Sequence, residues 1–254
     1  MSHGTKLWKG RKHYLDKMTL SELVQAYFAY PAIQAYLALT LISVGVTLYL
    51  GIGWVTLGRC VIAALLIYPL GWYLVHRFVL HGQFLYKSPR TAALWKRVHF
   101  DHHQDPNDLN VLFGALHTTL PAIALITLLP GWLMGGPAGA AAGFAAGLLI
   151  TCFYEFCHCI EHLAYTPKRR FLRRMKKLHL AHHFHNERGN YGITNFMPDR
   201  VLATYYASSE KVPRSPTVFN LGYTREESER YPWVAQLSGW QSEEEPSMEA
   251  HTGN

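Results

Sequence analysis

Charge is scarce in this chain: Asp, Glu, Lys and Arg make up only 16% of its 254 residues. Two long stretches, 31–58 and 109–154, contain none of the four. An apolar stretch of about 18 residues or more without charge is a candidate transmembrane helix. Because 49% of the residues are hydrophobic, the composition excludes a disordered polyelectrolyte. The mean hydropathy of -0.01 therefore averages membrane segments with concentrated polar ones.

Cysteine is also sparse, and its placement excludes two further classes of protein. The four cysteines lie within or beside apolar segments, without paired C-x-x-C spacing: Cys60, Cys152, Cys157 and Cys159. We interpret them as small buried thiols, which excludes a disulfide scaffold and a cysteine zinc site. The N-terminal residues are basic and polar with no short apolar region after them, so we expect no cleavable signal peptide.

The apolar segments predict four transmembrane helices in two hairpins, each close to the ~20 residues needed to cross a bilayer. Before them, Thr19 and Glu22 have the spacing of a capping box and predict a short amphipathic helix ending near Pro31. The first hairpin is expected to consist of spans 32–50 and 54–75, with a tight turn at Gly51 and Gly53. The second is expected to consist of spans 113–131 and 138–157, turned by Pro130-Gly131 and Gly135-Gly136-Pro137.

Basic residues predict how the chain is oriented. They gather in polar stretches at 6–17, 77–97 and 168–177, whereas the two opposite turns contain only Arg59. By the positive-inside rule the basic face is cytoplasmic. The net charge of +7 then reflects topology and attraction to anionic headgroups. Because no nucleic-acid-binding module accompanies it, we exclude nucleic acid as a partner.

We divide the chain into three parts on these grounds. Residues 1–31 form a basic N-terminal segment and amphipathic helix, and 32–215 a membrane-embedded domain. Residues 216–254 form a polar C-terminal tail that we expect to be solvated and partly disordered. The fold class that follows is an all-α integral membrane protein with a cytoplasmic helical cap.

Histidine is abundant, with 15 residues, and ten of them form four groups facing the predicted cytoplasmic side. Residues three or four apart on a helix share a face, so most groups can aim several imidazoles at one region. His76 and His81 are five apart and would diverge on a regular helix; either the helix ends between them or they reach different metals. The groups are His76 and His81; His99, His102 and His103; His158 and His162; and His179, His182 and His183.

Ten imidazoles gathered together predict a metal site, because burying them without partners would be costly. Neutral imidazole suits Zn, Cu, Fe and Ni, and ten ligands suit two ions. Structural zinc, hydrolytic zinc and O₂-activating iron all remain open on this ground.

Two other functions deserve comparison. The stretch from His158 to His162 matches H-x-x-E-H, in which Glu161 would be the general base of a zinc hydrolase, but eight histidines would stay unexplained. A membrane metal transporter would bind ions near the bilayer midplane, whereas these histidines lie at helix ends. Both are remote alternatives.

The ordered motifs H-x4-H, H-x2-H-H, H-x3-H and H-x2-H-H, interleaved with two hairpins, resemble the fatty acid hydroxylase/sterol desaturase superfamily over about residues 60–210. Their gaps are most similar to those of the fatty acid 2-hydroxylases, as is the segment 192–205. Pro198 stands where that family usually has Trp, and Ala203 where it has Gly, so the substrate-side lining can differ. The cytochrome b5 domain common in eukaryotic members would need an H-P-G-G stretch, which does not occur.

The resemblance implies a di-iron monooxygenase, with the ten histidines as ligands and zinc possible in a preparation. It would hydroxylate a lipid acyl chain with O₂ and two electrons from a separate cytochrome b5- or ferredoxin-like donor. An unactivated C–H bond has no acid–base handle, so the cofactor must supply the oxidising power. A carotenoid ring hydroxylase, a sterol desaturase and a sterol C4-methyl oxidase remain alternatives.

Further residues are expected around the ligands. A ligating histidine usually donates its outer N–H to an acceptor, and an ionisable residue inside a span is a functional candidate. The candidate acceptors are Glu155, Asp101, Asp105, Glu161 and Asp199, and the candidate substrate-lining residues are His117, Tyr191 and Asn195.

Overall fold

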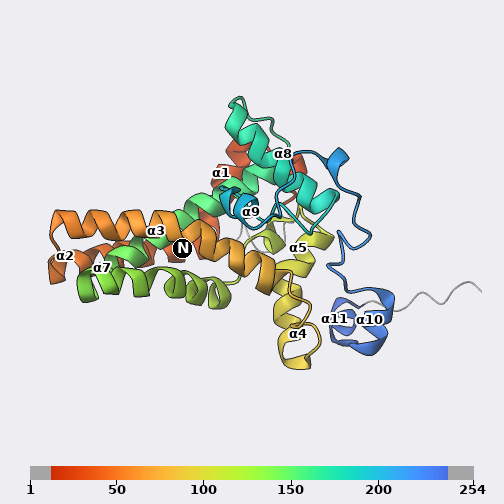
Figure 1. Cartoon of the computed structure of the whole chain (residues 1–254), viewed down its shortest axis with the longest axis horizontal. Helices are drawn as coiled ribbons and strands as arrows, with labels where there is room; N and C mark the ends of the chain where they lie inside the picture. The colour runs from red at the N-terminus through yellow and green to blue at the C-terminus, as the bar shows by residue number, and fades with distance from the viewer. Residues whose placement is uncertain (1–12, 240–254) are drawn as a thin grey trace, which may run out of the picture.

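The computed structural model describes residues 13–239, and within that range the chain is helical, with one isolated β-bridge between Tyr14 and Asp108. Figure 1 shows a long bundle of helices, one end of which is covered by shorter helices. The elements are η2 (Leu15–Lys17), α1 (Leu20–Ala29), α2 (Pro31–Leu50), α3 (Trp54–Leu74), η3 (Val75–Leu80), α4 (Pro89–Trp95), η4 (Lys96–Phe100), α5 (Asp101–Gln104), α6 (Leu109–Leu112), α7 (Leu116–His162), α8 (Arg170–Phe184), α9 (Met197–Val201), η5 (Ser209–Lys211), α10 (Arg225–Arg230) and α11 (Trp233–Ser238).

The start of α1 follows the predicted capping box. The Thr19 hydroxyl accepts from the Glu22 N–H, and the Glu22 carboxylate accepts from the Thr19 N–H at 2.9 Å. The helix ends at Tyr30 because Pro31 opens α2 as its first residue, where its missing N–H is not needed. The basic residues that precede His13 lie outside the described residues.

Three helices are long and apolar enough to cross a membrane: Pro31–Leu50, Trp54–Leu80 and Leu116–His162. Their outward side chains are apolar, with Leu48, Leu125 and Leu133 each more than 70% exposed. A soluble protein rarely exposes so extensive an apolar surface. The surface therefore suits contact with lipid tails. All four cysteines are free, and three of them are buried.

The third of these helices, α7, consists of two arms that fold back on each other. Its backbone leaves the helical conformation at Gly135 and Gly136, and Gly136 has φ 59°, which glycine adopts without strain. A Cβ added to Gly131 would lie 2.3 Å from the Gly139 carbonyl oxygen, so the arms touch through glycine backbone.

The break falls at Gly135 and Gly136, which we expected to turn this hairpin, but the ends of the two arms differ from our expectation. The first arm begins at Leu116 rather than at 113 and continues through Pro130 to the break, and the second arm extends to His162. A proline is tolerated inside such a helix because neighbouring groups can satisfy the freed backbone carbonyl.

The expected solvated tail is wrong for its described part, residues 216–239. Val218, Leu221, Tyr223 and Val234 are buried, and the last three form a cluster with Tyr86, Ala92, Trp95 and Phe100. Figure 1 shows α10 and α11 beside α4 accordingly. Four apolar residues spread among charged ones were too few to reveal this packing, because their partners come from a distant part of the sequence. Residues 240–254 lie outside the described range.

Candidate metal centre

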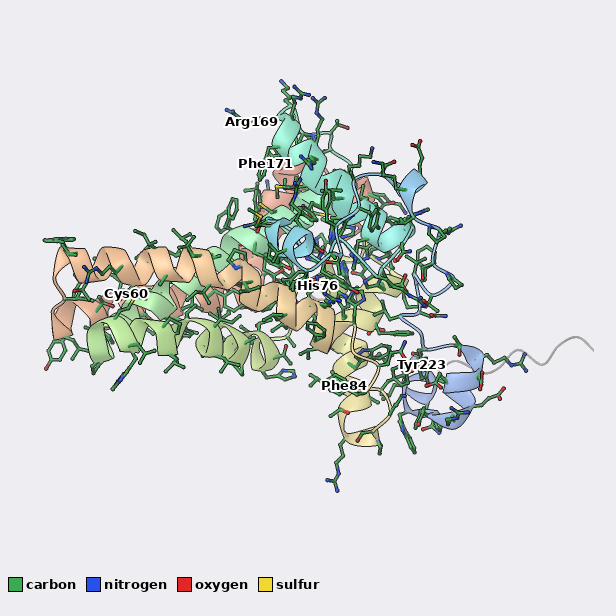
Figure 2. The ribbon with its side chains drawn as sticks, viewed as in Figure 1. Cys60, His76, Phe84, Arg169, Phe171 and Tyr223 are labelled. Carbon is green, nitrogen blue, oxygen red and sulfur yellow. The ribbon has the colours of Figure 1, made fainter. Side chains whose placement is uncertain are left out.

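All ten expected ligands meet at the end of the bundle, under the short helices; Figure 2 marks the place with His76. They come from η3, from η4 and α5, from the last turns of α7, and from α8. Nine are buried, and His81 is half-buried. The structure thus brings together in space four motifs that are separated in the sequence.

A π-helix explains how two histidines five residues apart reach the same place. In η3 the N–H of His81 donates to the carbonyl of His76 at 3.0 Å, the i→i+5 hydrogen bond of a π-helix. The two rings consequently lie 4.9 Å apart. The helix ends at Leu80, between the two histidines, as one of our alternatives had it; whether they bind different metals stays a prediction. The second motif also begins in a π-helix, η4, which contains His99.

The ring nitrogens of nine histidines fall into two groups, and within each group they lie within 4.8 Å of one another. His103 forms a third, bridging group with His182 and His183. We call the two groups site A (His76, His81, His99 and His182) and site B (His102, His158, His162, His179 and His183).

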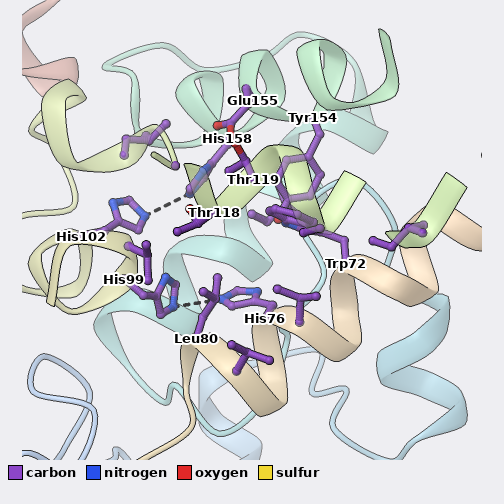
Figure 3. A pocket seen from close by; sticks show the side chains of 18 of the residues that line it. Trp72, His76, Leu80, His99, His102, Thr118, Thr119, Tyr154, Glu155 and His158 are labelled. Carbon is purple, nitrogen blue, oxygen red and sulfur yellow. Dashed lines mark hydrogen bonds between the residues drawn. The ribbon is translucent and has the colours of Figure 1, made fainter. Parts of the chain in front are cut away.

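The nitrogen–nitrogen distances suit shared metal ions. In site A, the Nε2 atom of His99 lies 3.2 Å from that of His76 and 2.9 Å from that of His81. In site B, the Nε2 atoms of His102 and His158 are 3.1 Å apart. Figure 3 shows the His76–His99 and His102–His158 contacts as dashed lines. Nitrogens that each lie ~2.0–2.1 Å from one ion are about 3 Å apart at a right angle.

Several buried nitrogens have no hydrogen-bond partner, which a metal ion would remedy. Among them are Nε2 of His103, Nε2 of His182 and both nitrogens of His183, of which an ion would bind one. A buried polar atom without a partner costs roughly 1–3 kcal/mol. The donor set, all imidazole, fits late first-row ions. The residues present therefore fit a pair of such ions.

Burial keeps these rings neutral, which is the form that binds metal. Desolvation lowers the pKa of His103 and of His182 to about 3. The same cause lowers the pKa of His99 and His102 well below the usual value.

Backbone carbonyls, not carboxylates, orient three of the rings. The Nδ1–H of His76 donates to the Tyr191 carbonyl at 2.6 Å, and that of His182 to the Gly189 carbonyl at 2.8 Å. His103 donates in the same way to the Val218 carbonyl at 2.9 Å. Each bond leaves Nε2 free to face the centre.

Of the expected carboxylate acceptors, only Glu161 approaches a ring nitrogen, with Oε2 3.8 Å from Nδ1 of His179. Asp101 instead pairs with Lys96 at 2.7 Å, because a lysine five residues earlier on the helix outcompetes a buried ring. Glu155 is buried and lines the cavity described below, and it hydrogen-bonds no histidine of the described chain. Asp105 is half-buried, and among the described residues its side chain hydrogen-bonds no histidine.

Asp199 hydrogen-bonds none of the ten histidines but holds the loop that contains Tyr191. Its carboxylate accepts from the N–H groups of Tyr191 and Gly192 and from the Thr204 hydroxyl, each at 2.8 Å. Burial raises the pKa of Asp199, against the opposing effect of these hydrogen bonds. The side chain thereby fixes the loop whose Tyr191 carbonyl accepts the hydrogen bond from His76.

A cavity of about 280 Å³ leads to the histidines (Figure 3). Its walls are mostly apolar, and Leu125, 78% exposed, marks where it meets the outside of the bundle. The lining includes five histidines from both sites and one carboxylate, Glu155: His76, His99, His102, His158 and His179.

The expected lining residues are not in this cavity. His117 is exposed, and the next two residues, Thr118 and Thr119, line the cavity instead. Asn195 is exposed and accepts from the Met197 N–H. Tyr191 is buried, and its ring packs 5.6 Å from that of His76.

Helical periodicity could have identified the residues that line this cavity. Trp72 precedes His76 by one turn, and Thr118, Ala122 and Ile126 recur every four residues. Residues at this spacing share one face of a helix.

The H-x-x-E-H alternative does not fit this geometry. Glu161 does not line the cavity, and its carboxylate faces the outer nitrogen of His179. A general base must reach the proton that it removes from a substrate or its attacking water. His185, two residues past the last histidine motif, lies outside both sites and hydrogen-bonds the Val212 carbonyl at 2.8 Å.

Fold and site together define a helical membrane-type protein whose histidine-rich centre can hold two metal ions. Residues 61–204, more than half of the chain, match the fatty acid hydroxylase family. The chain belongs to that family, which confirms the resemblance of its histidine motifs.

Individual relatives agree. Ceramide very long chain fatty acid hydroxylase SCS7 of Saccharomyces cerevisiae is 32% identical over 140 residues, which are 52% of this chain and 34% of the relative. Dihydroceramide fatty acyl 2-hydroxylase FAH2 of Arabidopsis thaliana is 30% identical, covering 61% and 63%. Fatty acid 2-hydroxylase of Rattus norvegicus is 30% identical, covering 56% and 38%. The chain thus spans less than two thirds of the length of these relatives.

The fold is also similar to a solved structure. Full-length scs7p, of which only the hydroxylase domain is visible, superposes with a TM-score of 0.61 at 26% identity, covering 74% of this chain and 69% of that one.

Proposed function

We propose that this chain is a membrane-bound di-iron monooxygenase that hydroxylates a lipid acyl chain at C2. The observation that carries the proposal is the position of two groups of imidazole nitrogens at the end of an apolar cavity in a lipid-facing bundle. The overall change is RH + O₂ + 2e⁻ + 2H⁺ → ROH + H₂O. The electrons would come from a separate donor, cytochrome b5-like or ferredoxin-like.

Sites A and B would each hold one ion, with His103 between them. We propose iron rather than zinc because the reaction needs a redox-active metal and zinc has no redox chemistry. Bound there, the ions would supply the O₂ chemistry that amino acid side chains cannot. The protein's own part is to keep ten rings neutral and oriented.

The cavity favours an acyl chain as substrate. Val79, Leu94, Leu125 and other apolar side chains line it up to the histidines, so a hydrocarbon would displace water and lie against both sites. The relatives named as acyl 2-hydroxylases support C2 as the position oxidised. The hydroxylase domain would be residues 32–215.

For topology, we propose four crossings with the metal centre at the cytoplasmic face. The antiparallel arms of α7 each have the length of a span, so α2, α3 and the two arms would form two hairpins. The basic stretch at the start of α8 lies on the same end as the metal centre, as the positive-inside rule requires for a cytoplasmic face.

The test is metal analysis together with lipid mass spectrometry of cells that express the protein. Wild type should hold two iron ions per chain and yield acyl lipids heavier by one oxygen, with the hydroxyl at C2. His102→Ala and His182→Ala should lose metal and product, whereas His117→Ala, a change of an exposed histidine, should keep both. Oxidised carotenoids or sterols would overturn the substrate, and unchanged metal in His102→Ala would overturn the site.

A further inference from the structure

The segment from Val212 to Ser238 lies beyond the residues that match the family, 61–204, yet it packs against the metal centre. We call it the C-terminal strap. It follows η5 in the chain and contains α10 and α11. It runs from beside the end of α8 to α4 (Figure 1).

At its middle the strap contacts the bridging histidine. The carbonyl of Val218, a residue only 2% exposed, accepts from Nδ1–H of His103 at 2.9 Å. The next carbonyl, of Phe219, accepts from the side-chain amide of Gln104 at 2.6 Å. Two successive strap carbonyls thus hold two successive residues of α5. The other nitrogen of His103, Nε2, points to His182 and His183 and has no hydrogen-bond partner.

One anchor ties the strap to the end of α8. Glu187 is 4% exposed, and its Oε1 accepts from the hydroxyls of Ser215 at 2.9 Å and Thr217 at 2.6 Å. The Ser215 N–H also donates to the His185 carbonyl at 2.8 Å. Since hydrogen bonds to a charged group are the stronger ones, Glu187 fixes the strap one residue before Val218.

A second anchor ties the strap to α4. The Tyr223 ring packs 5.1 Å from Tyr86 and 6.2 Å from Trp95, and all three are buried. Trp95 ends α4 and leads directly into η4, which contains His99. Val218 is therefore held from both sides.

We propose that the C-terminal strap is a positioning element of the metal centre, which sets the ring of His103 through the Val218 carbonyl. This rests on the proposed function, because it takes His103 as a metal ligand. A ring whose Nδ1–H is fixed by an acceptor must present Nε2 to the ions. His103 stands between the two sites, so its rotation would disturb both.

The experiment measures metal release from the full-length protein into a chelator, and the visible spectrum of the Co²⁺-substituted protein. Thr217→Val removes one hydroxyl from the Glu187 anchor at nearly constant shape, and Thr217→Ser restores it. Loss of an outer hydrogen bond to a metal ligand typically costs 10–100-fold in affinity. Thr217→Val loosens the segment that provides this bond to His103, so it should release metal faster, by about tenfold at most, and shift the Co²⁺ bands. Thr217→Ser should behave as wild type, as should Arg214→Ala, a change of an exposed strap residue.

A second perturbation acts on the acceptor itself. Replacing Phe219 with its α-hydroxy acid turns the Val218 carbonyl into an ester carbonyl, a weaker acceptor, and leaves all side chains in place. It should reproduce the Thr217→Val result, and it decides the matter if Thr217→Val fails to fold. If wild type holds two ions but both perturbed proteins match Arg214→Ala, the strap has no positioning role and the proposed function stands. If wild type binds no metal, both proposals fail.

Discussion

Asp199→Asn tests how the loop beside site A is held. The Asp199 side chain is fully buried and receives three donors, from Tyr191, Gly192 and Thr204. Asparagine keeps the shape but turns one acceptor oxygen into a donor. If its oxygen faces Tyr191 and Thr204, its NH₂ group meets the Gly192 N–H. In the opposite orientation the NH₂ group meets the Tyr191 N–H, and the Thr204 hydroxyl must turn to accept from it.

The magnitude follows from these contacts. A hydrogen bond to a charged group contributes about 1.5–3 kcal/mol, and a buried donor left unpaired costs about 1–3 kcal/mol. The backbone of this loop is tightly packed, because a Cβ on Gly192 would lie 2.4 Å from the Asn195 carbonyl oxygen. We expect the free energy of unfolding to fall by about 2–4 kcal/mol. Because the Tyr191 carbonyl holds His76, metal affinity at site A should also fall about tenfold or more.

Unfolding in detergent, followed with and without metal, measures the first effect, and competition with a chelator measures the second. Asn195→Ala is the matched control, because Asn195 is exposed in the same loop and accepts one bond, from Met197. Should Asp199→Asn unfold like this control and keep both ions, Asp199 does not hold the loop.

Three further predictions concern other features. Gly131→Ala places a Cβ 2.3 Å from the Gly139 carbonyl oxygen, so unfolding experiments should show a loss of about 1–3 kcal/mol; Gly45→Ala, with open space around it, should show none. Ala122→Phe puts a ring into the cavity and should lower product formation about a hundredfold by misplacing the acyl chain, while metal analysis still finds two ions; lost metal would contradict this. The metal-free protein should lose stability below pH ~6.5. Burial lowers the folded-state pKa of His103 and His182 to about 3, so the unfolded chain takes up protons first as pH falls. The loss should approach ~1.4 kcal/mol per pH unit for each such histidine, and equal denaturation midpoints at pH 7.5 and 5.5 after chelation would contradict it.

The sequence predicted what residue type and spacing encode. The uncharged stretches located α2, α3 and both arms of α7 within a few residues, because a lipid-facing helix must be apolar whatever its partners. The histidine motifs identified a centre whose members all meet. Spacings of three and four residues place side chains on one face of a helix whatever surrounds it. The Thr19 capping box was equally local and equally reliable.

What the sequence missed depends on backbone groups and on long-range contacts. Any residue has a carbonyl, so nothing distinguishes Tyr191, Gly189 and Val218 as acceptors until the loops are in place. A π-helix differs from an α-helix by hydrogen-bond register, which the residues from His76 to His81 do not reveal. The packing of Tyr223 against Trp95 joins segments more than a hundred residues apart, and no local sequence pattern predicts this contact.

The order of the elements along the chain has a consequence for biosynthesis. A polypeptide emerges from the ribosome N-terminus first, and α8, with His179, His182 and His183, follows every apolar helix of the described chain. The carbonyl that orients His103 emerges later still. The helices that could cross a bilayer are thus made before the last histidines of the candidate centre, and we expect maturation to proceed in two stages, insertion first and ion uptake second.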